Sequence, residues 1–108
     1  MEKLDVPQGT LDLMILTILV REPMHGYGIS QRLLVLSHDE FLVNPGSLFP
    51  SLYRLEQDGK LKAEWGATEN NRRAKYYRLT AAGRRQLERH RERWNRVSVA
   101  VTSVLEGA

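Results

Sequence analysis

A long apolar stripe near the C-terminus limits the folds that this sequence can adopt. Its members recur at alternating intervals of three and four residues, the spacing of a helix face that packs against another helix. They are Leu87, His90, Trp94, Val97, Val101 and Val104. Because a chain of 108 residues offers no obvious second segment to cover such a face, we expect it to pair with a second copy in a two-fold dimer. The predicted dimerisation helix occupies 80–108, with Thr80 as its N-cap.

Residues 1–79 have the pattern of a small mixed domain. Apolar residues at helical spacing predict a first helix over 11–19, ended by Pro23, and a second over 29–36 after a turn at 24–28. Residues 41–43 resemble a short strand. A third helix should begin at Ser47 as its N-cap, because Pro50 fits best in a first turn. Alternation over 61–65 and 75–79 predicts a hairpin with its tip at 67–73. The expected fold is mainly α with a small β hairpin, a winged helix-turn-helix.

The third helix and the hairpin tip together have the chemistry of a DNA-binding surface. Leucines at 48, 52 and 55 form an inward stripe, which predicts polar side chains on the opposite face for the major groove. Arg54 could pair with a phosphate or a guanine. Two arginines beside asparagines at a flexible tip can reach a narrow minor groove. The predicted DNA contacts are Ser47, Phe49, Pro50, Ser51, Tyr53, Arg54, Asn71, Arg72, Arg73 and Lys75.

The distribution of charge favours a polyanionic partner. Residues 1–54 carry four basic and six acidic side chains, a net charge of −2, whereas residues 55–108 carry twelve and seven, a net charge of +5. The alternative explanation for the arginines after Leu79 is a solvated helix face. With double-stranded DNA as the partner, a two-fold dimer would place its recognition helices roughly 34 Å apart and favour a palindromic operator.

Several segments, in order, carry a resemblance to a known family. They are 9–16 (GTLDLMIL), 25–29 (HGYGI), 46–52 (GSLFPSL), 54–56 (RLE) with Gly59, and 72–80 (RRAKYYRLT) with Gly83. The sequence resembles the PadR family of bacterial winged-helix regulators, in its compact form with a single C-terminal helix. The resemblance implies dimerisation through that helix and repression relieved by a small molecule or another cue. The family commonly has tyrosine where this chain has Phe49, which cannot donate to a phosphate; Tyr53 on the same helix could compensate.

A small planar aromatic effector is a further expected partner. Trp94 could stack on such a molecule near the dimer seam, with Met14 and Val97 as the other residues of the candidate pocket. The alternative is that Trp94 is an ordinary core residue, since a large aromatic side chain at helical spacing usually is.

Other function classes have less support in the sequence. The three histidines, His25, His38 and His90, lie on different predicted elements, and there is no glycine-rich phosphate loop or nucleophile elbow, so we expect no enzyme, cofactor or metal site. A protein-interaction adaptor that uses the C-terminal helix stays the alternative, although it would not need the cationic hairpin tip. The absence of cysteine, of a signal peptide and of a long apolar run favours the cytoplasm over secretion or a membrane.

Overall fold

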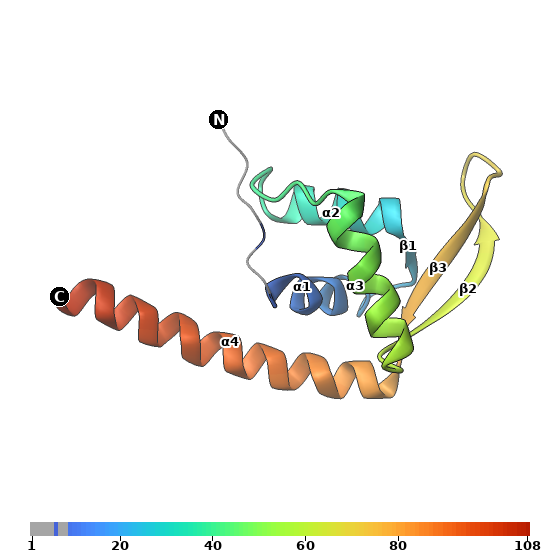
Figure 1. Ribbon diagram of the computed structural model, residues 1–108. Helices are drawn as coiled ribbons and strands as arrows, with labels where there is room; N and C mark the ends of the chain where they lie inside the picture. The colour runs from blue at the N-terminus through green and yellow to red at the C-terminus, as the bar shows by residue number, and fades with distance from the viewer. Residues whose placement is uncertain (1–5, 7–8) are drawn as a thin grey trace.

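Four helices and a small antiparallel sheet make up the fold, as the mainly α pattern predicted (Figure 1). The computed structural model describes residue 6 and residues 9–108. The elements are α1 (Thr10–Ile18), β1 (Met24–His25), α2 (Gly26–Leu36), α3 (Pro45–Gln57), β2 (Leu61–Ala67), β3 (Arg73–Leu79) and α4 (Ala81–Gly107).

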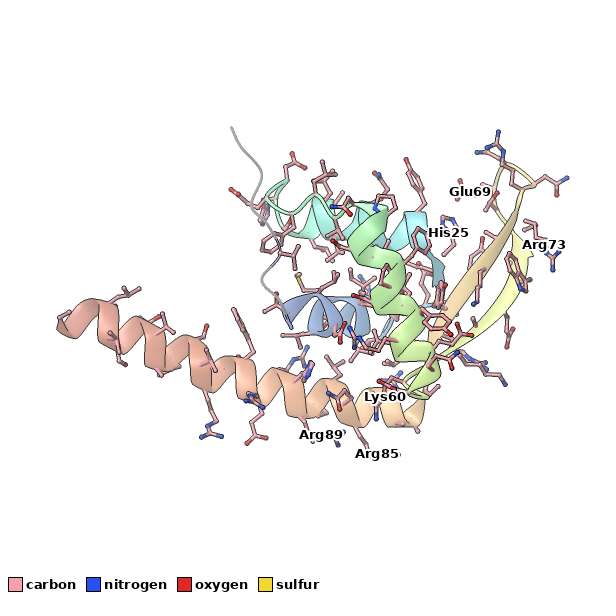
Figure 2. The ribbon with its side chains drawn as sticks, viewed as in Figure 1. His25, Lys60, Glu69, Arg73, Arg85 and Arg89 are labelled. Carbon is pink, nitrogen blue, oxygen red and sulfur yellow. The ribbon has the colours of Figure 1, made fainter. Side chains whose placement is uncertain are left out.

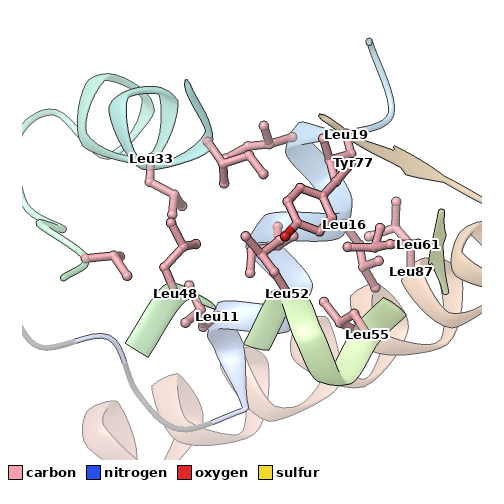
Figure 3. Packing of buried hydrophobic residues seen from close by; sticks show 14 residues of the cluster. Leu11, Leu16, Leu19, Leu33, Leu48, Leu52, Leu55, Leu61, Tyr77 and Leu87 are labelled. Atoms are coloured by element: carbon pink, nitrogen blue, oxygen red, sulfur yellow. The ribbon is translucent and has the colours of Figure 1, made fainter. Parts of the chain in front are cut away.

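The core lies where α1, α2 and α3 meet one face of the sheet and the first turns of α4 (Figure 3). Ile15, Leu16, Ile29 and Leu52 are fully buried. The leucine stripe at 48, 52 and 55 faces inward as predicted. Leu87 corrects one prediction: at 3% exposure it belongs to the core of its own domain, because the first turns of α4 pack on α1, so it offers no surface to a partner.

The sheet has the strand order β1-β3-β2. The predicted hairpin is confirmed, with β2 and β3 paired from Leu61 opposite Leu79 to Ala67 opposite Arg73. The predicted turn at 24–28 is wrong: Met24 and His25 pair with β3, and Gly26 begins α2. The imidazole of His25 is the N-cap of α2, with Nδ1 accepting from the Gly28 amide at 3.0 Å.

The segment before α3 also differs from the prediction. Residues 41–43 form none of the three strands of the sheet. The Ser37 hydroxyl accepts from the Phe41 amide at 2.9 Å, and Val43 is buried in the core while Leu42 is exposed. The third strand of the sheet, β1, therefore precedes α2, whereas the sequence pattern predicted a strand between α2 and α3.

The third helix begins earlier than predicted. Asn44 is the N-cap of α3, because its side-chain oxygen accepts from the Ser47 amide at 2.9 Å. Pro45 takes the first helical position, where its missing N–H costs nothing. Ser47 therefore lies inside the first turn, and Pro50 lies within the helix.

The C-terminal helix extends well beyond the rest of the fold (Figure 1). Thr80 is its N-cap, as predicted, with its hydroxyl oxygen accepting from the Gly83 amide at 3.0 Å. In Figure 1 the second half of α4 projects away from the other helices and the sheet, and Val97, Val101 and Val104 on it are exposed.

Candidate nucleic-acid interface

One flank of α3 faces α1. Arg54 donates to both carboxylate oxygens of Asp12, from Nη1 to Oδ2 at 2.6 Å and from Nη2 to Oδ1 at 2.9 Å. These hydrogen bonds raise the pKa of Arg54 above its usual value. Ser47, Ser51 and Arg54 border a hollow that Gly9 and Asp12 line from the other side. One edge of the polar stripe predicted to face away from the domain thus borders α1, while Ser47 and Arg54 remain exposed.

The opposite flank of α3 faces α2 and the sheet. The ring of Phe49 lies over Gly26, where an added Cβ would approach the Phe49 Cε1 atom to 2.7 Å. Farther along this flank, Lys75 of β3 donates to Glu56 at 2.9 Å. This hydrogen bond raises the pKa of Lys75 above its usual value. Tyr53 on this flank remains 63% exposed.

The outer surface of α3 is open between these flanks. Ser47, Phe49, Pro50 and Tyr53 are exposed, and Ser51 is half-buried with its hydroxyl donating to the Ser47 carbonyl. Phe49 is 47% exposed and Tyr53 is 63% exposed, so their rings give this surface more apolar area than its serines do. This surface therefore offers both apolar and polar contacts, which suit the bases and backbone of a DNA groove.

The hairpin tip is an ordered, hydrogen-bonded loop. The Thr68 amide donates to the Arg72 carbonyl and the Asn71 amide to the Thr68 carbonyl, both at 2.8 Å. Asn71 adopts the left-handed conformation, with φ 58°, that asparagine tolerates better than most residues. The loop that the composition suggested would be flexible thus has a defined turn.

The charged side chains of the hairpin are arranged on both sides of the tip (Figure 2). The Arg73 guanidinium carbon lies 4.5 Å from the centre of the Trp65 ring, a cation–π contact between β3 and β2. Asn71 and Arg72 are exposed. Glu69, which the sequence reasoning left out, places one acid in the same loop.

Asp12 and Glu56 are the site residues that the sequence reasoning missed. Each binds a cation predicted to contact DNA, and each lies far from it in the chain, 42 residues for Asp12–Arg54 and 19 for Glu56–Lys75. For Asp12 the available signal was the presence of a carboxylate on a helix that is otherwise largely apolar, because such a group needs a partner when buried.

The predicted dimer and pocket residues differ in how far they are buried. Trp94, Val97, Val101 and Val104 are 45–68% exposed, and His90 is half-buried. Met14 instead packs against the core. A hollow between α1, α2 and α4 is lined by Ile18, Met24, Leu36 and several arginines, and none of the three predicted pocket residues lines it.

The described part of the chain has neither a cluster of metal ligands nor a membrane-spanning helix. No three histidine, aspartate or glutamate side chains there are grouped so that they could hold a metal ion. No helix there has the length and hydropathy needed to cross a bilayer.

Comparisons with known proteins agree with this geometry. The model of the transcriptional regulator PadR-like family matches residues 15–89. A transcriptional regulator of Mycobacterium tuberculosis is 40% identical over 68 residues, 63% of this chain and 60% of that protein.

Solved structures match over nearly the whole chain. The PadR-like transcriptional regulator of Bacillus cereus has a TM-score of 0.80 at 32% identity, over 94% of this chain and 96% of that one. A PadR family regulator of Eggerthella lenta has a TM-score of 0.77 at 32% identity, over 94% and 86%. The family and these neighbours are transcriptional regulators and not enzymes. The chain therefore belongs to the PadR-like family of transcriptional regulators, whose members bind DNA as transcription factors.

Proposed function

We propose that this regulator binds a palindromic operator as a homodimer, with α3 in the major groove and the β2–β3 hairpin at the adjacent minor groove. The observation that carries the proposal is the exposure of the outer face of α3 beside a hairpin with two arginines at its tip. The proposed contacts are Ser47, Phe49, Pro50, Ser51 and Tyr53 from α3, and Asn71, Arg72 and Arg73 from the hairpin.

The dimer is supported by the unpaired face of α4. Trp94, Val97, Val101 and Val104 lie on one side of a helix whose second half extends beyond the domain, and Leu105 adds a fifth exposed apolar side chain at 75%. Covering such an apolar face lowers the free energy of a protein in water. A second copy provides an identical face, and the two-fold contact closes on itself.

We propose a small planar aromatic compound as the effector, with Trp94 as its stacking surface. Trp94 is 45% exposed in the single chain, on the face of α4 that would lie at the dimer seam, where a planar ligand would stack on its ring between the two copies. Such compounds should quench tryptophan fluorescence in the wild type and in Trp65→Ala but not in Trp94→Ala. No response to a broad panel would remove this part of the proposal.

We infer that the protein represses transcription in the cytoplasm. A dimer bound over a promoter excludes the polymerase from it, and binding to chromosomal DNA requires the protein to be where that DNA is. In a reporter strain, the cloned operator should lower expression only when the protein is present; increased expression would show activation instead.

The central test is selection of duplexes from a random-sequence pool by the purified protein, followed by fluorescence anisotropy with the selected and a shuffled duplex. We expect a palindromic sequence to be enriched and to bind at least about a thousandfold more tightly than the shuffled duplex. Equal weak binding to both would show only an electrostatic attraction, and absence of binding at low salt would favour the adaptor function of α4.

A further inference from the structure

The recognition helix is held from both flanks by ion pairs that span long stretches of sequence. On one flank, Arg54 forms its two-point contact with Asp12 of α1, with N–O distances of 2.6 Å and 2.9 Å. On the other, Glu56 accepts from Lys75 of β3 at 2.9 Å. Two residues apart on α3, Arg54 and Glu56 thus connect the helix to α1 and to the hairpin.

The Asp12–Arg54 pair has the geometry of a structural contact. The Asp12 side chain is only 15% exposed, and a carboxylate removed from water needs a partner for its charge. Both of its oxygens are bound by the guanidinium, in the planar arrangement that only arginine provides. A DNA phosphate that took over the two N–H donors bound to Asp12 would leave that carboxylate unpaired.

The two pairs supply a restraint that the core does not. The leucines at 48, 52 and 55 hold α3 by hydrophobic contact, which has no directional preference of its own. Hydrogen-bonded ion pairs on opposite flanks are directional and resist rotation of the helix about its own axis. The rotation matters because it changes which side chains of α3 meet the base edges.

We propose that Arg54 and Lys75 are positioning residues: their ion pairs with Asp12 and Glu56 set the orientation of α3 between α1 and the hairpin, and so determine operator affinity without contact to DNA. This inference rests on the proposed function, because it assigns a role within the same DNA-binding surface. It replaces the direct contacts that the sequence alone suggested for these two cations.

The test compares the two members of each pair. The variants are Asp12→Asn, Arg54→Gln and their double, and Glu56→Gln, Lys75→Gln and their double, each titrated with the selected duplex at several salt concentrations. We expect each single variant to weaken binding by about twofold to fivefold, the effect of a partly exposed ion pair, and the double to be no weaker than its worse single. The slope of log affinity against log salt should stay at the wild-type value.

The Arg72→Ala/Arg73→Ala variant calibrates the salt slope, since each lost phosphate contact lowers its magnitude by about 0.9. Circular dichroism and thermal melting identify any variant that is not folded at the temperature of the titration, and the titration is then repeated at a lower temperature.

Two outcomes would overturn the inference alone. One such outcome is that Arg54→Gln lowers the magnitude of the salt slope by about 0.9 while Asp12→Asn leaves operator affinity unchanged or improves it. Arg54 would then contact a DNA phosphate directly, and its pairing with Asp12 would oppose that contact. If none of the variants changes affinity, the pairs do not set the orientation that DNA requires. A wild-type protein that enriches no duplex would instead remove the proposed function, and this inference with it.

Discussion

Gly83 lies where α4 meets the backbone that joins α3 to β2. A Cβ there would overlap the Lys60 carbonyl oxygen and lie 2.7 Å from Leu79 Cδ1. We expect Gly83→Ala to lower the free energy of unfolding by about 1–3 kcal/mol, because a backbone oxygen cannot move aside as a flexible side chain can. Urea unfolding measures this. Gly107→Ala is the control, since nothing lies within 4 Å of its added Cβ; equal effects at both positions would show that the close approach is not the cause.

Tyr77 links stability to alkaline pH. Burial raises the pKa of its phenol in the folded protein. Between the unfolded pKa of about 10 and the raised folded pKa, the unfolded chain binds fewer protons than the folded one, so the free energy of unfolding falls as pH rises. We expect a decline that begins near pH 10, continues as the pH rises through the raised folded pKa, and is smaller in Tyr77→Phe. An equal decline in both proteins would assign it to other groups, such as Lys75, whose pKa is also raised.

At the scale of single elements, the hairpin is the part whose charge can be tested separately. We expect Arg72→Ala/Arg73→Ala to weaken binding to the selected duplex and to lower the magnitude of the salt slope by up to about 1.8, because both cations are exposed near the tip. Fluorescence anisotropy at several salt concentrations measures both quantities.

The matched control removes the same charge from another element. Arg85 and Arg89 are exposed on α4, at the end of the molecule opposite the hairpin tip (Figure 2). Arg85→Ala/Arg89→Ala should leave the slope near the wild-type value. Equal losses from the two double variants would mean that DNA responds to net charge and not to the hairpin.

At the scale of the whole molecule, the exposed face of α4 predicts a specific effect on assembly. Val101→Asp would place an unpaired charge at the proposed dimer seam, and we expect the dimer dissociation constant to rise at least about tenfold. Sedimentation equilibrium measures it. Val99→Asp is the control, because Val99 is exposed on the opposite side of the same helix. A wild-type monomer at micromolar concentration, or equal effects of the two variants, would contradict the dimer proposed here.

The long-range contacts explain which predictions about the site were incomplete. The spacing of Leu48, Leu52 and Leu55 predicted the buried face of α3, but it could not distinguish the flank beside α1 from the outer surface. Asn44 and Ser47 are both good N-caps, and only the structure shows that Asn44 takes this role. A two-residue strand such as Met24–His25 is too short to have a recognisable alternation.

The features of the fold that could be predicted from the sequence are local ones. Side-chain period distinguishes helix from strand, so four helices, the hairpin, the Thr80 cap and the inward leucines were predictable from neighbouring residues. The tertiary structure decided which distant groups meet: β1 with β3, Arg54 with Asp12, Lys75 with Glu56, and Leu87 with the core. The physical reason is that a charged or apolar side chain can be satisfied by any suitable partner, and only the packing of α1, α3 and the sheet selects one.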